Sequence, residues 1–243
     1  MDWSSLSISF KCCVFANLAF WMASLANVAV DYLAQSKQNN LHKWKLQPVF
    51  LTTQQLWDVL MLSGLNMVLI APLICCPLFE WVWNWHVPPG IRLQETEPWQ
   101  WQRELIRIPI DLIVNEIVFY STHYLLHASP FLYQHVHKIH HRFKAPCAMA
   151  AAYAHPLEFI FGNVLGIGAG PILTNAHPYT AYAWFTLALL STCKGHSGYD
   201  ILNARTHDIH HQLTNFNFGV IDLGDYVMGT RNPGNTKRIK DYS

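Results

Sequence analysis

The sequence predicts an all-α integral membrane protein of about four transmembrane helices, the last region being a helical hairpin, with a histidine-rich helical cap on the cytosolic side. Hydrophobic residues make up 51% of its 243 residues and charged residues only 13%, about half the charged share of ordinary soluble domains. Twelve of the fourteen histidines lie between His123 and His211. The formal net charge of +1 gives no indication of nucleic-acid binding.

Apolar runs predict the helices in order. Residues 10–30 and 59–79 each have the roughly 20 apolar residues that a transmembrane helix needs. A third run, 106–126, has the same length but carries Asp111, Asn115 and Glu116. The fourth region, 157–193, is too long for one span and is interrupted at Gly166, Gly168, Gly170, Pro171 and Pro178. We therefore expect it to form two helices joined by a turn.

The charges around the first run suggest its orientation. This run is longer than the core of a usual secretory signal, so we expect an uncleaved anchor. Lys37, Lys43 and Lys45 follow it, and the positive-inside rule places this connection in the cytosol. Every histidine cluster then falls at a cytosolic helix end.

Tryptophans are concentrated between the second and third runs, on both sides of residues 88–90. Because tryptophan favours the headgroup region, we expect a luminal interfacial segment here, with ordinary core packing as the alternative. The tryptophans are Trp81, Trp83, Trp85, Trp99 and Trp101. The chain is expected to form a single membrane domain, 1–243, with a transmembrane and interfacial region at 1–104, a histidine-bearing region at 105–231 and a tail at 232–243.

The histidines recur at spacings that suit metal ligands. On a helix, residues three or four apart share a face, so each cluster directs two or three imidazoles the same way. A single histidine on an apolar face is more often a core or solvated residue, but buried imidazoles need partners, and a set this large indicates metal binding. The candidates are His123, His127, His137, His140, His141, His196, His207, His210 and His211. One tetrahedral ion takes four ligands, so nine favour two ions; imidazole suits zinc, copper, iron and nickel alike.

Three further residues are candidates for the same site. Glu116 is seven residues before His123, and at 100° per residue the two share a helix face within about 20°. This carboxylate is expected to accept from a ligating histidine or to bind the opposite metal, with a helix–helix polar contact as the alternative. Asp200 follows His196 by four residues, so a helical turn would offer an oxygen ligand beside the nitrogen. His155 would either bind metal or hydrogen-bond and shape the cavity.

The order of these histidines resembles the fatty acid hydroxylase and sterol desaturase superfamily of membrane di-iron enzymes. The similarity runs from about Glu116 to Thr230 and is greatest to the sterol C4-methyl oxidase branch. It is carried by the stretches His137-Lys-Ile-His-His141, Tyr153-Ala-His-Pro-Leu-Glu158, His196-Ser-Gly-Tyr-Asp200 and Gly229-Thr230. The sequence departs from the pattern at Ala128, where many members have histidine, and at Arg231, where an acidic residue is usual.

The resemblance implies a function, cofactors and partners. The nine histidines would hold two iron ions, with zinc as a substitute in a purified sample, and Glu116 and Asp200 would assist catalysis. Dioxygen would be the co-substrate, and electrons would come from an NAD(P)H-dependent reductase, often through cytochrome b5. The expected reaction is hydroxylation of a methyl or methylene group of a sterol, isoprenoid or acyl lipid in the endoplasmic reticulum membrane, with the metal site on the cytosolic side. The alternatives are a desaturase on the same scaffold and a histidine-rich metal transporter or store.

Overall fold

The computed structural model describes residues 2–36, 40–87 and 92–234. These residues form helices and no β-strand, and their one isolated bridge joins Lys45 to Tyr199. The prediction of an all-α protein is therefore confirmed. Lys37, residues 88–90 and the end of the predicted tail, 235–243, lie outside the described residues.

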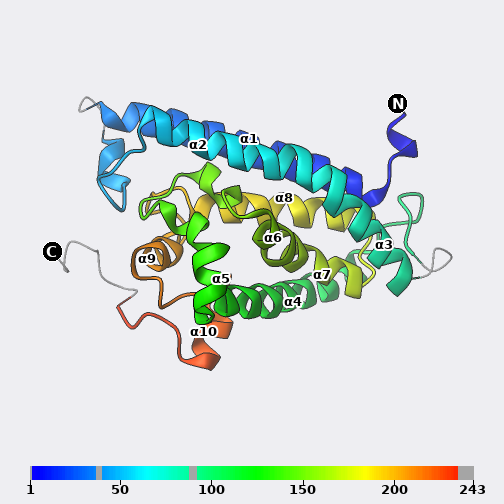
Figure 1. Cartoon of the computed structure of the whole chain (residues 1–243). Helices are drawn as coiled ribbons and strands as arrows, with labels where there is room; N and C mark the ends of the chain where they lie inside the picture. The colour runs from blue at the N-terminus through cyan, green and yellow to red at the C-terminus, as the bar shows by residue number, and fades with distance from the viewer. Residues whose placement is uncertain (1, 37–39, 88–91, 235–243) are drawn as a thin grey trace.

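The long helical segments run roughly parallel and form a bundle (Figure 1). They are α1 (Ile8–Gln35), α2 (Thr53–Gly64), η3 (Leu65–Cys75), α3 (Cys76–His86), α4 (Trp101–Ala128), α6 (Pro156–Glu158), η6 (Phe159–Val164), α7 (Leu165–Leu173) and α8 (Pro178–Gly195). The segments η3 and η6 are π-helical continuations of α2 and α6. The short elements are η1 (Trp3–Ser5), η2 (Leu41–Trp44), α5 (Pro130–His135), η4 (His137–Arg142), η5 (Ala148–Ala152), α9 (Arg205–Leu213) and α10 (Leu223–Met228).

Three helical stretches of the described chain are long and apolar enough to cross a bilayer: Ile8–Gln35, Thr53–His86 and Pro156–Leu173. They correspond to the first, second and fourth predicted regions. The third region is helical as predicted and lies in α4, which is 28 residues long, but α4 is not among these three stretches. The chain is thus a multi-pass membrane protein whose two less apolar long helices, α4 and α8, pack against α7 and α1.

The predicted hairpin is present at 156–195, and glycine makes its packing possible. The turn at 174–177 joins α7 to α8, where the His177 ring accepts a hydrogen bond from the Tyr179 backbone N–H at 3.2 Å. A Cβ on Gly170 would lie 2.6 Å from Cα of Asp111, so only glycine allows α7 to approach α4 this closely.

The tryptophans before α4 were expected either at the membrane interface or in the core, and the structure has both environments. Trp83 is buried, whereas Trp81 and Trp85 are exposed.

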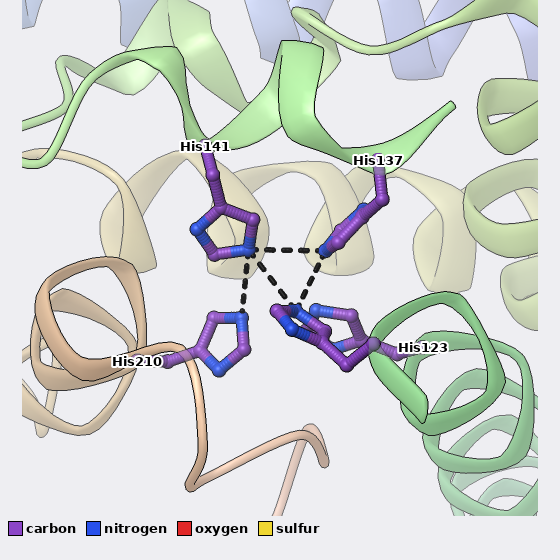
Figure 2. A group of neighbouring side chains, drawn as sticks. His123, His137, His141 and His210 are labelled. Atoms are coloured by element: carbon purple, nitrogen blue, oxygen red, sulfur yellow. Dashed lines mark hydrogen bonds between the residues drawn. The ribbon is translucent and has the colours of Figure 1, made fainter. Parts of the chain in front are cut away.

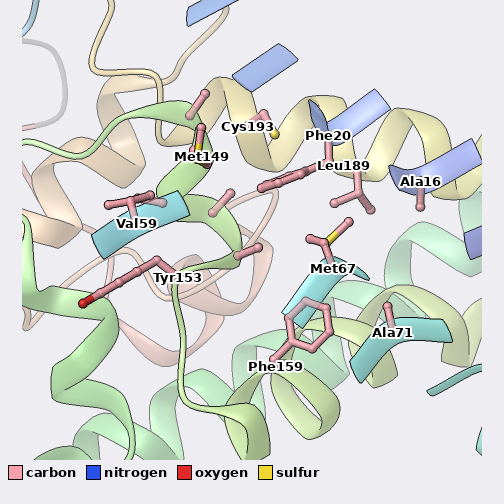
Figure 3. Close-up of a cluster of buried hydrophobic side chains, with 14 of the residues drawn as sticks. Ala16, Phe20, Val59, Met67, Ala71, Met149, Tyr153, Phe159, Leu189 and Cys193 are labelled. Atoms are coloured by element: carbon pink, nitrogen blue, oxygen red, sulfur yellow. The ribbon is translucent and has the colours of Figure 1, made fainter. Parts of the chain in front are cut away.

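The core lies where α1, α2–η3 and α8 surround the segment η5, all five residues of which are buried (Figure 3). Two buried asparagines hold this segment. Asn66 donates Nδ2 to the carbonyls of Ala152 and Ala154 at 2.8 and 2.9 Å, and the Asn27 oxygen accepts from the Ala148 N–H at 2.8 Å. Because only residues 143–147 separate η5 from η4, these bonds also restrain η4, which carries three of the clustered histidines.

Candidate metal centre

The nine histidines predicted as ligands gather in two neighbouring groups. Several of the elements that carry them, among them α9, lie at one end of the bundle (Figure 1). Within each group the candidate ligand nitrogens lie within 4.8 Å of one another. The first site consists of His123, His127, His137, His141 and His210. The second site consists of His140, His196, His207 and His211. The arrangement matches the expectation of two ions sharing nine ligands.

Each His-x-x-His-His motif contributes to both sites. In η4 the outer histidines, His137 and His141, belong to the first site and His140 to the second. In α9 the roles are exchanged, because only His210 joins the first site. Rings four residues apart thus serve one site while the histidine between them serves the other, which explains why each motif carries three rings.

The ring nitrogens of the first site have the spacing of atoms that share an ion. Nε2 of His137 lies 2.8 Å from Nε2 of His127 and 3.0 Å from that of His141. Nε2 of His141 is in turn 3.1 Å from the Nε2 atoms of both His127 and His210. Figure 2 shows these rings converging. Two nitrogens bound to one ion at about 2.0–2.1 Å and a right angle would lie about 3.0 Å apart.

Hydrogen bonds to carbonyl oxygens fix the protonated nitrogen in the second site. His140 donates Nδ1–H to the Tyr153 carbonyl at 3.2 Å, and His196 donates Nδ1–H to the Thr192 carbonyl at 2.8 Å. A neutral imidazole has only one N–H, so Nε2 of each ring carries a lone pair. These two atoms are nevertheless 3.3 Å apart. A cation that accepts both lone pairs removes the repulsion between them.

Unpaired nitrogens point to the same conclusion. In the first site His123 and His210 donate Nδ1–H to the carbonyls of Phe218 and Phe216, at 2.8 and 2.7 Å. Nε2 of His123 is then buried without a partner among the described residues. His211 is buried, and neither of its ring nitrogens has a partner in the same part of the chain. Each unpaired buried polar atom costs about 1–3 kcal/mol, and a bound ion would supply the missing partner.

The rings are held in the neutral form that metals require. Burial lowers the pKa of His140 to about 4 and that of His196 to about 3. Burial and the neighbouring histidines lower the pKa of His207 and His210 well below the usual value. At neutral pH, protons therefore do not compete with a metal ion for these nitrogens.

Glu158, which was not among the predicted site residues, places its carboxylate against a histidine of the first site. Its Oε1 lies 2.8 Å from Nδ1 of His137, and its Oε2 has no partner among the described residues. Such a carboxylate fixes the tautomer and orientation of a ligating histidine. The available signal was a carboxylate inside an apolar run, which is costly in a membrane and marks a functional candidate.

Glu116 does not take the predicted position beside the histidines. Its Oε2 accepts from the backbone N–H groups of Val220 and Ile221 at 2.6 and 2.9 Å, and its Oε1 accepts from Gly224 at 2.8 Å. Nδ1 of His123, for which Glu116 was the expected acceptor, donates instead to the Phe218 carbonyl. Three backbone donors occupy Glu116, so its contribution is to hold the loop that carries the Phe216 and Phe218 carbonyls.

Asp200 and His155 also lie outside both sites. The helical turn expected to place Asp200 beside His196 does not form, because α8 ends at Gly195 and Gly198 adopts a φ of +73°. The Asp200 carboxylate forms an ion pair with Arg205. His155 caps α6, accepting on Nδ1 a hydrogen bond of 3.2 Å from a backbone N–H two residues on.

A cavity of about 480 Å³ leads from the membrane-spanning part of the bundle to the two sites. Its walls are mostly apolar and come from α1, η3, α4, η6 and α8, with Phe119, Phe159 and Trp184 among them. His123 and His140, one from each site, also line it. Pockets of this size, about 300–1,000 Å³, accommodate small-molecule ligands.

Fold and site together define a multi-pass helical membrane protein with two adjoining histidine sites at the end of an apolar cavity. The family model described as fatty acid hydroxylase matches residues 108–230, which are just over half of the 243 residues. The chain belongs to this family, and the resemblance inferred from the histidine series is confirmed.

Relatives within the family carry names that indicate different reactions. The chain is 36% identical to fatty acid hydroxylase ahd1 of Mycosarcoma maydis, over 66% of this chain and 41% of that protein. It is 36% identical to human fatty acid hydroxylase domain-containing protein 2, over 52% and 38%, and 35% identical to methylsterol monooxygenase 2-2 of Arabidopsis thaliana, over 54% of each. The chain thus matches about two fifths to about half of the length of these relatives. No solved structure matches significantly.

Metal content tests the division into two sites. We expect the purified protein to contain two metal ions per chain, and His140→Ala or His210→Ala to retain about one, because each substitution removes a ligand from only one site. His135→Ala is the matched control, since His135 is exposed and lies outside both sites. Elemental analysis by mass spectrometry measures the ratio. Loss of both ions in each single variant would contradict two separable sites.

Glu158→Leu tests the role of the carboxylate. Removal of the Nδ1 acceptor should lower the metal affinity of the first site by about 10–100-fold and leave the second site unchanged. Glu158→Gln, which keeps an acceptor oxygen, should have a smaller effect. Chelator competition measures both affinities, and equal affinities for the wild type and Glu158→Leu would exclude this role.

Proposed function

We propose that the chain is a membrane-bound di-iron oxygenase that hydroxylates an unactivated methyl or methylene carbon of a sterol, isoprenoid or acyl lipid. The single observation that supports this most is the opening of an apolar cavity onto two sites built from neutral imidazoles. Membership of the fatty acid hydroxylase family favours iron over the other metals that imidazole binds. The overall reaction consumes dioxygen, two electrons and two protons and yields the hydroxylated lipid and water.

The proposed roles of the protein follow from its contacts. The nine histidines would hold two iron ions, which when bound supply the activation of dioxygen for C–H cleavage. The carbonyls of Phe218, Thr192 and Tyr153 keep the Nδ1 protons in place, so that Nε2 faces the metal. Phe119 and Phe159 line the cavity and exclude water from it. No acid or base of the chain needs to enter this scheme, and Glu116 and Asp200 would act by holding the loops that they bind.

The cellular setting is proposed on the family resemblance and the charge bias. The protein would reside in the endoplasmic reticulum membrane with both sites at the cytosolic face. Electrons would come from a separate NAD(P)H-dependent reductase, directly or through cytochrome b5. This placement agrees with Lys43 and Lys45 lying in the connection between α1 and α2, where the positive-inside rule predicts a cytosolic loop.

Turnover with isotopically labelled dioxygen tests the proposal. The protein in lipid nanodiscs, with reductase, cytochrome b5, NADPH and a membrane lipid extract, should yield a lipid that has gained one labelled oxygen. His140→Ala and His210→Ala should reduce this product by at least about 10-fold, while His135→Ala retains it. Loss of a group that only hydrogen-bonds to a metal ligand already costs about 10–100-fold, and loss of the ligand itself should cost no less.

Other outcomes identify the alternatives. A product that has lost two hydrogens and carries no label would identify a desaturase, since both reactions begin with removal of one hydrogen. Metal release without reductant-dependent oxygen consumption would identify a metal carrier. Full turnover in both histidine variants would contradict any role of the two sites in catalysis.

A further inference from the structure

One face of α4 forms a wall of the cavity and carries a single amide. The residues at this face recur every three or four positions, which is the helical repeat. They are Ile108, Leu112, Asn115, Phe119, Thr122 and Leu126. Asn115 therefore lies in the middle of an apolar stripe that ends at the metal-binding histidines.

Asn115 is buried, and its side chain has no hydrogen-bond partner in the described part of the chain. Its Oδ1 is shielded completely, and a Cβ on Gly166 of α7 would lie 3.4 Å from that oxygen. An unpaired buried amide is costly, and more so in a membrane, where no bulk solvent replaces the missing bonds. Three other asparagines line the cavity. Asn17 donates to the Cys13 carbonyl at 3.0 Å and Asn163 to the Ala151 carbonyl at 3.5 Å, whereas Asn203 is exposed.

The position of Asn115 along α4 sets a distance. Asn115 precedes His123 by eight residues, which corresponds to about 12 Å along the helix axis. A ligand that contacts Asn115 and also reaches the histidines must therefore extend over about that length. Asn115 and the histidines both line the cavity of about 480 Å³.

We propose that Asn115 binds the oxygen-bearing end of the lipid substrate, so that the carbon presented to the metal centre is remote from that polar group. The Nδ2 group of this amide can donate to a hydroxyl, carbonyl or carboxylate oxygen. This inference rests on the proposed function for the identity of the reacting carbon, but not for binding. It disfavours oxidation of a carbon beside the recognised hydroxyl, because a separation of one or two bonds cannot cover about 12 Å.

Binding of defined lipids tests the contact without turnover. The metal-loaded protein, anaerobic and without reductant, is titrated with 1-hexadecanol and n-hexadecane and with cholesterol and cholestane, and native mass spectrometry measures the bound fraction. We expect the hydroxylated member of at least one pair to bind about tenfold or more tightly, the factor for one buried hydrogen bond. Asn115→Leu should reduce this preference to near unity.

Two further variants make the result specific. Asn115→Ala removes the amide without adding volume and should lose the same preference if the leucine variant fails to fold. Asn17→Leu, in the same cavity but with its amide paired within α1, should retain the preference. Unaltered metal content shows that each variant is folded.

Three results of the binding test would overturn the inference. The wild type could show no preference for the hydroxylated lipid, which would leave water as the partner of Asn115. The preference could be unchanged in both Asn115 variants, or it could be lost equally in Asn17→Leu.

The position of the new oxygen in the labelled-dioxygen product gives a second test. This oxygen should lie far from the polar group, and a product with the two on neighbouring carbons would also overturn the inference. Failure of the binding test alone leaves the proposed oxygenase intact, whereas absence of any labelled product contradicts the oxygenase and not the contact.

Discussion

The structure depends on the need of nine neutral imidazoles, seven of them buried and two half-buried, for a positively charged partner. Backbone carbonyls hold the Nδ1 protons of His123, His140, His196 and His210, so Nε2 of each is left with a lone pair facing other nitrogens. Such an arrangement is unfavourable without a cation, because lone pairs 3 Å apart repel and cannot be hydrated inside the protein. Metal binding and the folding of this end of the bundle are therefore expected to be coupled.

The rest of the chain supplies the rigidity that this arrangement requires. Asn27 and Asn66 tie the buried segment η5 to the membrane helices, which restrains the end of the preceding η4. Glu116 binds three backbone N–H groups near the C-terminus, and Asp225 accepts from the N–H groups of Phe218 and Gly219 at 2.8 and 2.7 Å. These two carboxylates shape the loop whose carbonyls orient His123 and His210.

Periodicity and ligand chemistry were sufficient to predict the helical membrane fold, the hairpin at 156–195 and the identity of the clustered histidines, because each is recorded in local spacing. Tertiary contacts were not predictable in this way. The spacing of Glu116 and His123 correctly placed both residues in one helix, α4. It could not show that the Glu116 carboxylate accepts hydrogen bonds from a loop more than 100 residues away in sequence. Asp200 was misplaced because the expected helical turn from His196 to Asp200 does not form where Gly198 has a φ of +73°. Glu158 was missed because its partner is 21 residues away in sequence.

The most direct test of the central claim is an experimental structure of the protein purified anaerobically from iron-replete cells, with anomalous scattering recorded at the iron edge. We expect two peaks, one within bonding distance of the Nε2 atoms of His127, His137 and His141 and the other beside those of His140, His196 and His207. A single peak, peaks bound elsewhere, or rings that hydrogen-bond one another around water would contradict the account.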